Sequence, residues 1–151
     1  MGKYYSTVDA YNTSLTRTTA TALSVARQSL AATSVGNYAL FGGGYDIDRI
    51  FSTVDAYNTS LTRTTATPLS EARNNLAATS VGNYALFGGG YDADNYKDSV
   101  DAYDTLLTRT TPTPLSVARY WLAATSVGNY ALFGGGTGGS ALSTVDAYTV
   151  S

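Results

Sequence analysis

Residues 76–90 have the sequence Leu-Ala-Ala-Thr-Ser-Val-Gly-Asn-Tyr-Ala-Leu-Phe-Gly-Gly-Gly, and the same stretch occurs at residues 30–44 and 122–136. Around it, residues 6–51 and 52–97 differ at 8 of 46 positions. A fixed period of this length indicates a repeat architecture, in which each unit needs its neighbours to bury a core. We therefore interpret residues 1–151 as one domain with repeats at 6–51, 52–97 and 98–142, followed by an extra strand at 143–151.

Each copy is predicted to hold four short strands separated by turns. In the middle copies, residues 76–80 form a first strand and residues 84–87, which run into three glycines, form a second. Residues 53–57 alternate as a third strand, with Val54 and Ala56 on one face and Asp55 and Tyr57 on the other. Residues 61–65 are β-branched and mostly polar, which is typical of an exposed edge strand. The predicted unit is an antiparallel four-stranded sheet without helices.

Four-stranded units that repeat every 40 to 50 residues are typical of β-propeller blades, since the coils of a β-solenoid are shorter. The Ala-Ala strand suits the innermost position, where blades converge and large side chains would collide. The Thr-rich strand suits the outer rim. The predicted fold class is thus all-β, with about three propeller blades in the chain.

The order of these motifs resembles a kelch repeat over nearly the whole chain. The resemblance lies in an Ala-Arg pair, a small-residue strand, a Tyr-aliphatic-Phe strand ending in glycines, Val-Asp-Ala-Tyr, and Leu-Thr-Arg. Leu15, Leu61 and Leu107 depart from it, because they stand where the family usually has Trp. The resemblance implies a blade fold, but kelch proteins include sugar oxidases, actin-binding proteins and peptide-recognising adaptors, so it selects no function.

Composition excludes several classes of function. Nine Lys and Arg against eleven Asp and Glu give a net charge of −2, which argues against a nucleic-acid partner of the usual basic kind. No apolar run approaches the length of a membrane span, so no membrane partner is expected. With no His and no Cys, the chain lacks imidazole bases, thiolates and the ligands of most zinc and copper sites. We expect no cofactor, no metal site, no catalytic residues and no enzymatic activity.

Three blades do not close a ring, because known propellers use about 4 to 8. The chain begins with third and fourth strands and ends with first, second and third strands. We therefore expect a homodimer of six blades, in which each N-terminal hairpin completes the last blade of its partner. One Val-Asp-Ala-Tyr strand in each chain, at residues 6–11 or 144–149, is surplus in this scheme. The alternative is that the sequence is a piece of a longer propeller.

The differences between copies concentrate in loops that should share one face of the propeller. These are the loops between the second and third strands and those that lead into each first strand. A variable face on a constant scaffold is typical of recognition, although drift at unconstrained positions gives the same pattern. The candidate ligand-binding residues on this face are Arg27, Gln28, Ser29, Tyr45, Arg73, Asn74, Asn75, Tyr91, Arg119, Tyr120 and Trp121.

Arg27, Arg73 and Arg119 precede the innermost strand in each copy, so a closed ring would gather their side chains around the channel mouth. Guanidinium groups placed there would favour a carboxylate, a sulfate or an acidic peptide. The structural alternative is that each Arg bonds carbonyl or acidic groups of the blades. The sequence thus leads to a binding module for a carbohydrate or peptide, and the alternative function is a self-assembling scaffold, natural or designed, with no specific ligand.

Overall fold

A computed structural model describes residues 2–150, which form thirteen short β-strands and no α-helix. Accordingly, none of the described residues belongs to a helix that could span a membrane. The first sheet holds β1 (Asp9–Tyr11) and β2 (Arg17–Thr19). The second holds β3 (Ala31–Val35), β4 (Tyr38–Gly42), β5 (Val54–Tyr57) and β6 (Arg63–Thr65). The third holds β7 (Ala77–Val81), β8 (Tyr84–Gly88), β9 (Val100–Tyr103) and β10 (Arg109–Thr110), and the last holds β11 (Ala123–Val127), β12 (Tyr130–Gly134) and β13 (Val145–Thr149).

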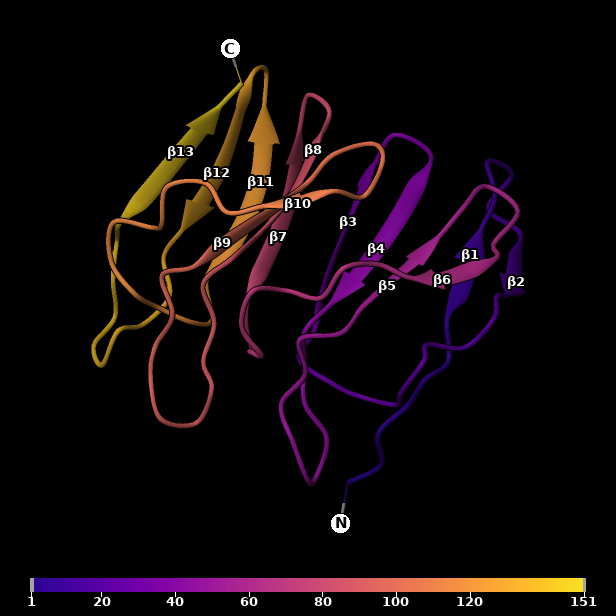
Figure 1. The fold of residues 1–151 in the computed structure, drawn as a ribbon, viewed down its shortest axis with the longest axis horizontal. Helices are drawn as coiled ribbons and strands as arrows, with labels where there is room; N and C mark the ends of the chain where they lie inside the picture. The colour runs from indigo at the N-terminus through magenta and orange to yellow at the C-terminus, as the bar shows by residue number, and fades with distance from the viewer. Residues whose placement is uncertain (1, 151) are drawn as a thin grey trace.

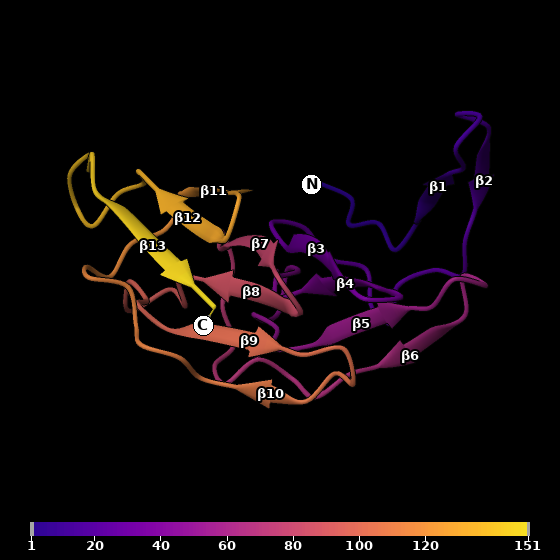
Figure 2. The same ribbon diagram turned by 90° about the horizontal axis from the view of Figure 1, so that it is seen from above.

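The four sheets stand side by side along an open arc (Figures 1 and 2). Strands β3, β7 and β11 line the inner side of the arc and follow one another there, whereas β6 and β10 lie on the outer rim (Figure 2). This arrangement confirms the predicted all-β class with four-stranded antiparallel blades, Ala-Ala strands innermost and Thr-rich strands outermost. The blades are offset from the sequence repeats, because residues 6–51 supply two strands to one sheet and two to the next.

Strand register follows the predicted turns closely. In the middle blade Val81 pairs with Tyr84, and the two residues between them form the turn, with Gly82 at a φ of +55°. Glycine adopts this left-handed conformation without a steric cost, which explains a tight turn at this position. The first strand begins at Ala77 and includes Val81, so it lies one residue later than the sequence suggested.

The hydrophobic core lies between neighbouring blades. One cluster joins Val35, Leu40 and Val54 of the second sheet to Phe87 and Tyr103 of the third. A second cluster joins the third sheet to the last in the same way. Because the two middle sheets are covered on both sides, all four residues of β5 and of β9 are buried, whereas β1 and β13 at the ends of the arc are partly exposed.

Neighbouring blades interlock through phenylalanine and glycine. A Cβ atom added at Gly42 would lie 2.9 Å from Phe87 of the next blade, and one added at Gly88 would lie 2.8 Å from Phe133. Such distances are too short for any side chain, so the glycine leaves room for the aromatic ring. The first glycine of the first two triplets is therefore a packing requirement between blades.

The turn between the third and fourth strands places a leucine in a left-handed conformation. Leu15, Leu61 and Leu107 have φ values of 60°, 61° and 63°, in the left-handed region. In the middle copy, the Asn58 side-chain oxygen accepts hydrogen bonds from the backbone N–H groups of Ser60 and Thr62 and so holds this turn. The position expected to hold Trp is thus a tight-turn residue in this chain.

Candidate functional site

The variable loops meet at one end of the blades, as predicted, and the Val-Gly-Asn turns lie at the other end (Figure 1). The residue after each Arg exchanges two backbone hydrogen bonds with the residue after the glycine triplet. Gln28 pairs in this way with Tyr45, and Asn74 pairs with Tyr91, at N–O distances of 2.9 to 3.0 Å. Tyr120 pairs with Thr137 at 2.9 and 3.1 Å. The backbone thus presents three equivalent loop pairs on one face.

Four aromatic rings gather on this face, and we call them the aromatic cluster: Tyr91, Tyr96, Tyr120 and Trp121. Tyr120 stacks on Tyr91 at 5.1 Å and on Tyr96 at 5.4 Å between ring centroids. Trp121 adjoins Tyr120 at 4.9 Å with the ring planes tilted by 47°. The cluster therefore joins the loop that follows β8 to the segment that precedes β11.

Trp121 is the most exposed member of the cluster and the one Trp in the sequence, with 67% of its surface accessible. Its φ is +58°, which is unfavourable for a bulky L-residue. Ser29 and Asn75 occupy the same position in the other copies with φ values of 58° and 53°. The backbone imposes this conformation in every copy, and the third copy places a tryptophan on it.

These three positions are also joined by hydrogen bonds along the inner side of the arc. The backbone N–H of Asn75 donates to the carbonyl oxygen of Ser29, and that of Trp121 donates to the carbonyl oxygen of Asn75, each at 2.9 Å. A shallow hollow lies along this line and is lined by Ser29, Leu30, Asn75, Leu76, Trp121 and Leu122. The candidate residues Ser29, Asn75 and Trp121 are therefore neighbours around the inner mouth of the arc.

A charged network found in the middle copy alone fixes the loop that carries two of the aromatic rings. Lys97 Nζ lies 2.8 Å from Asp92 and 3.0 Å from Glu71. The hydrogen bond from Ser99 and the charge of Lys97 hold the pKa of Glu71 below its usual value, despite the opposing effect of burial. Lys97 likewise lowers the pKa of Asp92, while Asp92 and Glu71 raise the pKa of Lys97. The network thus keeps its charges over a wide range of pH.

The first copy presents a different surface at the equivalent place. The Gln28 side-chain amide donates to the hydroxyl of Tyr45, whose ring lies 6.2 Å from that of Tyr4, edge to face. Asp46 accepts hydrogen bonds from the backbone N–H groups of Asp48 and Arg49, as Asp92 does from Asp94 and Asn95. These aspartates cap loops, and the described residues include no group of three or more His, Cys, Asp or Glu that would hold a metal ion.

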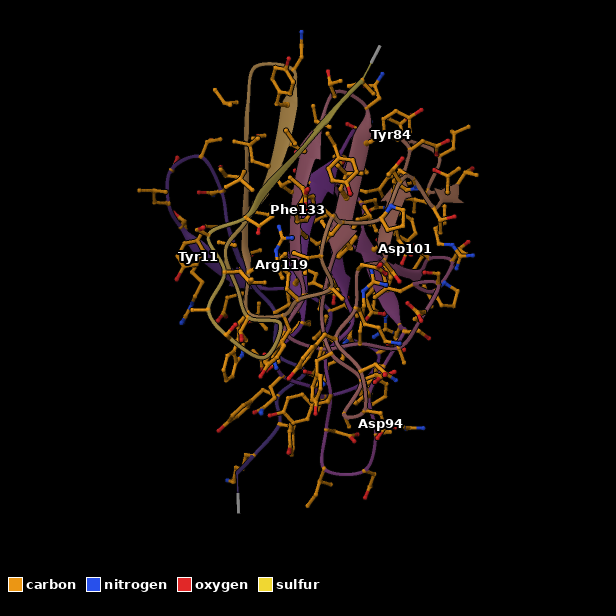
Figure 3. The ribbon with its side chains drawn as sticks, turned by 90° about the vertical axis from the view of Figure 1, so that its left-hand side faces the viewer. Tyr11, Tyr84, Asp94, Asp101, Arg119 and Phe133 are labelled. Carbon is orange, nitrogen blue, oxygen red and sulfur yellow. The ribbon has the colours of Figure 1, made fainter. Side chains whose placement is uncertain are left out.

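The three arginines lie inside the blades, which differs from the expectation of a guanidinium ring around a channel mouth. Arg27, Arg73 and Arg119 are at most 3% exposed. Each lies 3.0 to 3.1 Å from the aspartate of the third strand in its own blade, namely Asp55, Asp101 and Asp146. Figure 3 shows Arg119 and Asp101 among the strands, whereas Asp94 lies out on a loop. The arginines are scaffold, and a surface ligand does not reach them.

The arginines also bond the backbone at the end of the second strand. Arg73 and Arg119 donate to the carbonyl oxygens of Phe87 and Phe133 at 3.0 and 2.9 Å. Asp101 further accepts hydrogen bonds from the backbone N–H and hydroxyl of Ser70. Each pair thus ties the segment before the first strand to the second and third strands of the same blade, which is why the Arg recurs with the Asp.

Of the other candidates, Asn74 is 6% exposed and its side-chain oxygen accepts a hydrogen bond from the amide of Asn75 at 2.7 Å. Tyr96, which is 41% exposed, belongs to the cluster but was not among the sequence candidates. A backbone bridge to Tyr91 brings Tyr96 into the cluster, and the sequence of the loop does not reveal this bridge. The structure thus brings together Tyr91, Tyr120 and Trp121, adds Tyr96, and leaves Gln28 and Tyr45 in a separate patch.

The fold defines the class of the protein as all-β, with propeller-type blades. The solved structure of YjhT is similar to this chain, with a TM-score of 0.81 and 15% sequence identity over 96% of this chain and 50% of that one. The chain therefore spans half the length of that structure, and the likeness concerns the fold alone. No protein-family model and no curated protein matches the chain.

Proposed function

We propose that this chain is a non-enzymatic binding module that recognises a carbohydrate or a peptide on its variable loop face. The observation that carries the proposal is the aromatic cluster with the exposed ring of Trp121. Exposed Trp and Tyr side chains are frequent anchors of binding surfaces, because they offer a large rigid area at a small cost in conformational entropy.

A carbohydrate is the favoured ligand because neutral groups surround the exposed ring. The C–H faces of sugar rings stack on aromatic rings, and amides and hydroxyls bond their hydroxyl groups. Asn75 and Ser29 lie beside Trp121 around the inner hollow, and Thr137 pairs with Tyr120. The arginines that would favour an acidic ligand are buried, so they do not support the binding of a charged partner.

Strain supports a role for Trp121 in recognition. An Asn or Ser at this φ satisfies the backbone, as the other two copies demonstrate. An exposed Trp in a left-handed conformation costs about 1 kcal/mol or more and contributes little to the core. Retention of such residues is typical of functional positions.

The test is a glycan array and a peptide array probed with the polypeptide of residues 1–151. The best hit is then titrated by isothermal titration calorimetry, which can also be used for a variant that lacks the single Trp. We expect Trp121→Ala and Tyr96→Ala each to weaken binding about tenfold or more. Tyr130→Ala is the matched control, because Tyr130 is 51% exposed at the opposite end of β12.

No reproducible hit on either array would overturn the proposal and favour the scaffold alternative. Equal losses for Tyr130→Ala and Trp121→Ala would overturn the location of the site. The kelch resemblance stays a prediction, since it selects neither a carbohydrate nor a peptide.

A further inference from the structure

The two ends of the arc carry complementary halves of the contact that joins its blades. Within the chain, Phe87 packs on Gly42 and Phe133 packs on Gly88. At the last blade, a Cβ added at Gly134 would meet only Val145, at 3.5 Å, so the place of a phenylalanine is open. At the other end, Phe41 is only half-buried, while Phe87 and Phe133 are 0% exposed.

The backbone hydrogen bonds between blades are likewise left unfinished. Gly44 and Gly90 donate to the carbonyl oxygens of Arg73 and Arg119 in the next blade at 3.0 and 2.9 Å. Among residues 2–150, no backbone donor is bonded to the equivalent carbonyl of Arg27, and the equivalent N–H of Gly136 has no backbone acceptor. The line from Ser29 to Trp121 is open in the same way, with the Ser29 N–H at one end and the Trp121 carbonyl at the other.

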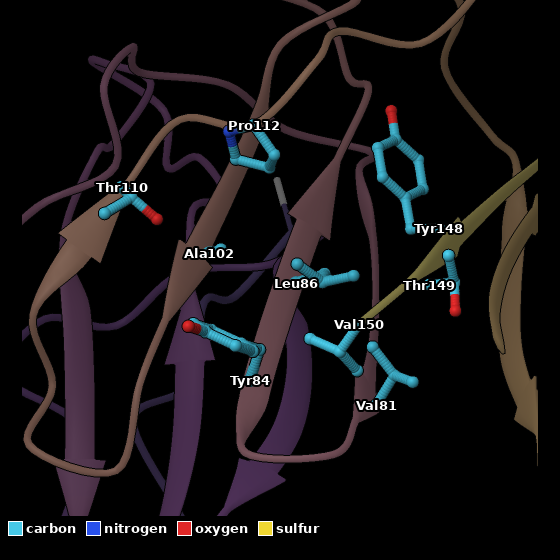
Figure 4. A pocket seen from close by; sticks show the side chains of 9 residues that line it. All are labelled: Val81, Tyr84, Leu86, Ala102, Thr110, Pro112, Tyr148, Thr149 and Val150. Atoms are coloured by element: carbon cyan, nitrogen blue, oxygen red, sulfur yellow. The ribbon is translucent and has the colours of Figure 1, made fainter. Parts of the chain in front are cut away.

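A hollow beside the last blade marks the place of a missing turn residue. Between the two four-stranded blades, Leu107 packs against the core cluster that contains Val35. The equivalent place beside the last blade is a hollow lined in part by Val81, Tyr84 and Leu86 (Figure 4). Leu15 is the N-terminal equivalent of Leu107 and is 79% exposed. Leu15 thus lacks a packing site at the N-terminal end of the arc, and the last blade at the other end has such a site with no leucine in it.

The strands at the two ends are complementary as well. The last sheet lacks a fourth strand, and β1–β2 is a third and fourth strand without a first and second. Asp9 is exposed and makes no ion pair within the described residues, whereas its equivalents Asp55, Asp101 and Asp146 each pair with an arginine. The hairpin therefore has the sequence of a blade edge but not its surroundings.

We propose that a second copy of this chain closes the arc into a six-bladed ring with two-fold symmetry. The β1–β2 hairpin of each copy enters the last blade of the other and takes the place of β13. Both third strands contain Val-Asp-Ala-Tyr, so the exchange preserves the contacts of that strand and adds a fourth. The gain of the fourth strand and of two buried end faces drives the exchange.

The closed ring satisfies each open group with an equivalent one. Asp9 of the partner subunit replaces Asp146 beside Arg119, and Leu15 of the partner subunit fills the hollow of Figure 4. Phe41 of the partner subunit packs on Gly134. Ser29 of the partner subunit donates to the carbonyl oxygen of Trp121, so the second copy also borders the aromatic cluster.

The first test is the mass of the 151-residue polypeptide in solution at micromolar concentration, by light scattering. We expect twice the 15.8 kDa of the single chain. Removal of residues 143–151 should leave this dimer intact, because the hairpin replaces β13. Removal of residues 1–20 should abolish it. A full-length chain of 15.8 kDa, or a monomer after removal of residues 143–151, would overturn the proposal.

Two point variants separate assembly from folding. Leu15→Asp changes an exposed turn residue, so the single chain should keep its circular dichroism spectrum while the dimer is lost. Leu106→Asp is the control, because Leu106 is 85% exposed in the equivalent turn of an inner blade and should leave the dimer unchanged. Gly134→Val should also give a folded monomer. Dimers that persist in both Leu15→Asp and Gly134→Val would show that the ends do not meet as proposed.

Discussion

The guanidinium of Arg73 lies 3.1 Å from the carboxylate of Asp101, and both side chains are fully buried. Burial lowers the pKa of Arg73, and the carboxylate of Asp101 opposes that effect, so Asp101 offsets part of the cost of burying the guanidinium. Loss of one partner leaves the other charge buried without compensation. We expect Arg73→Met to lower the free energy of unfolding by about 3 kcal/mol or more, measured by urea denaturation.

Two controls accompany this variant. Arg73→Met combined with Asp101→Leu removes both charges and should recover much of the lost stability. Lys3→Met changes an exposed cation outside the β1–β2 hairpin and should have little effect. If Arg73→Met were as stable as Lys3→Met, the buried pair would not support the blade.

Gly88 is expected to tolerate no side chain, because of the ring of Phe133. A valine there would force the ring or the β8 backbone to move, since the added Cβ lies 2.8 Å from Phe133. We expect Gly88→Val to lower the free energy of unfolding by about 1–3 kcal/mol. Thr149→Val, at an exposed position of β13, is the control and should be close to neutral in the same denaturation experiment.

Trp121 can be exchanged for the residue that holds the same place in the middle copy. Asparagine tolerates a φ near +58°, as Asn75 does, so Trp121→Asn should raise the free energy of unfolding by about 1 kcal/mol. Trp121→Leu removes the aromatic ring but keeps an unfavourable residue at this φ, so it should not be stabilised. A destabilised Trp121→Asn would mean that the ring contributes more to packing than its 67% exposure indicates.

Buried tyrosines should make the fold sensitive to alkali. Burial, aided by the charge of Asp146, raises the pKa of Tyr148 to about 12. Burial and nearby aspartates also raise the pKa of Tyr57 and Tyr103, and each of the three hydroxyls donates to a backbone carbonyl. Because the unfolded chain ionises near pH 10, this contribution to stability is complete below that pH and is lost as the pH rises toward 12.

The measurement is the midpoint of urea unfolding between pH 8 and pH 12, with tyrosinate absorbance recorded in parallel. Tyr103→Phe, in the middle blade, should flatten the decline of stability in this range. A midpoint that stays constant up to pH 12 would contradict the burial of these hydroxyl groups.

The sequence predicted the blades because the repeat reports period, turn and strand order together. It also predicted which loops meet, since alternation of antiparallel strands decides that. The position of the arginine side chains was not predicted, because the sequence does not reveal whether Arg73 points toward solvent or across the sheet to Asp101. The recurrence of an Asp 27 or 28 residues after each Arg was the available signal. Tyr96 was not predicted as a site residue, because its stacking on Tyr120 depends on the path of an irregular loop.

The sequence has four Val-Asp-Ala-Tyr segments but only three positions for them beside β4, β8 and β12. The four segments therefore compete for these positions during folding. Any second strand accepts any copy of the segment with the same local contacts, so only chain connectivity separates the native pairing from mispaired ones. Native pairings join strands that are close in the sequence, so they form first. Mispaired strands must separate before the arc is complete. Folding of the single chain should therefore be fast, and the later exchange of β13 for the partner's hairpin should be slower and should depend on protein concentration.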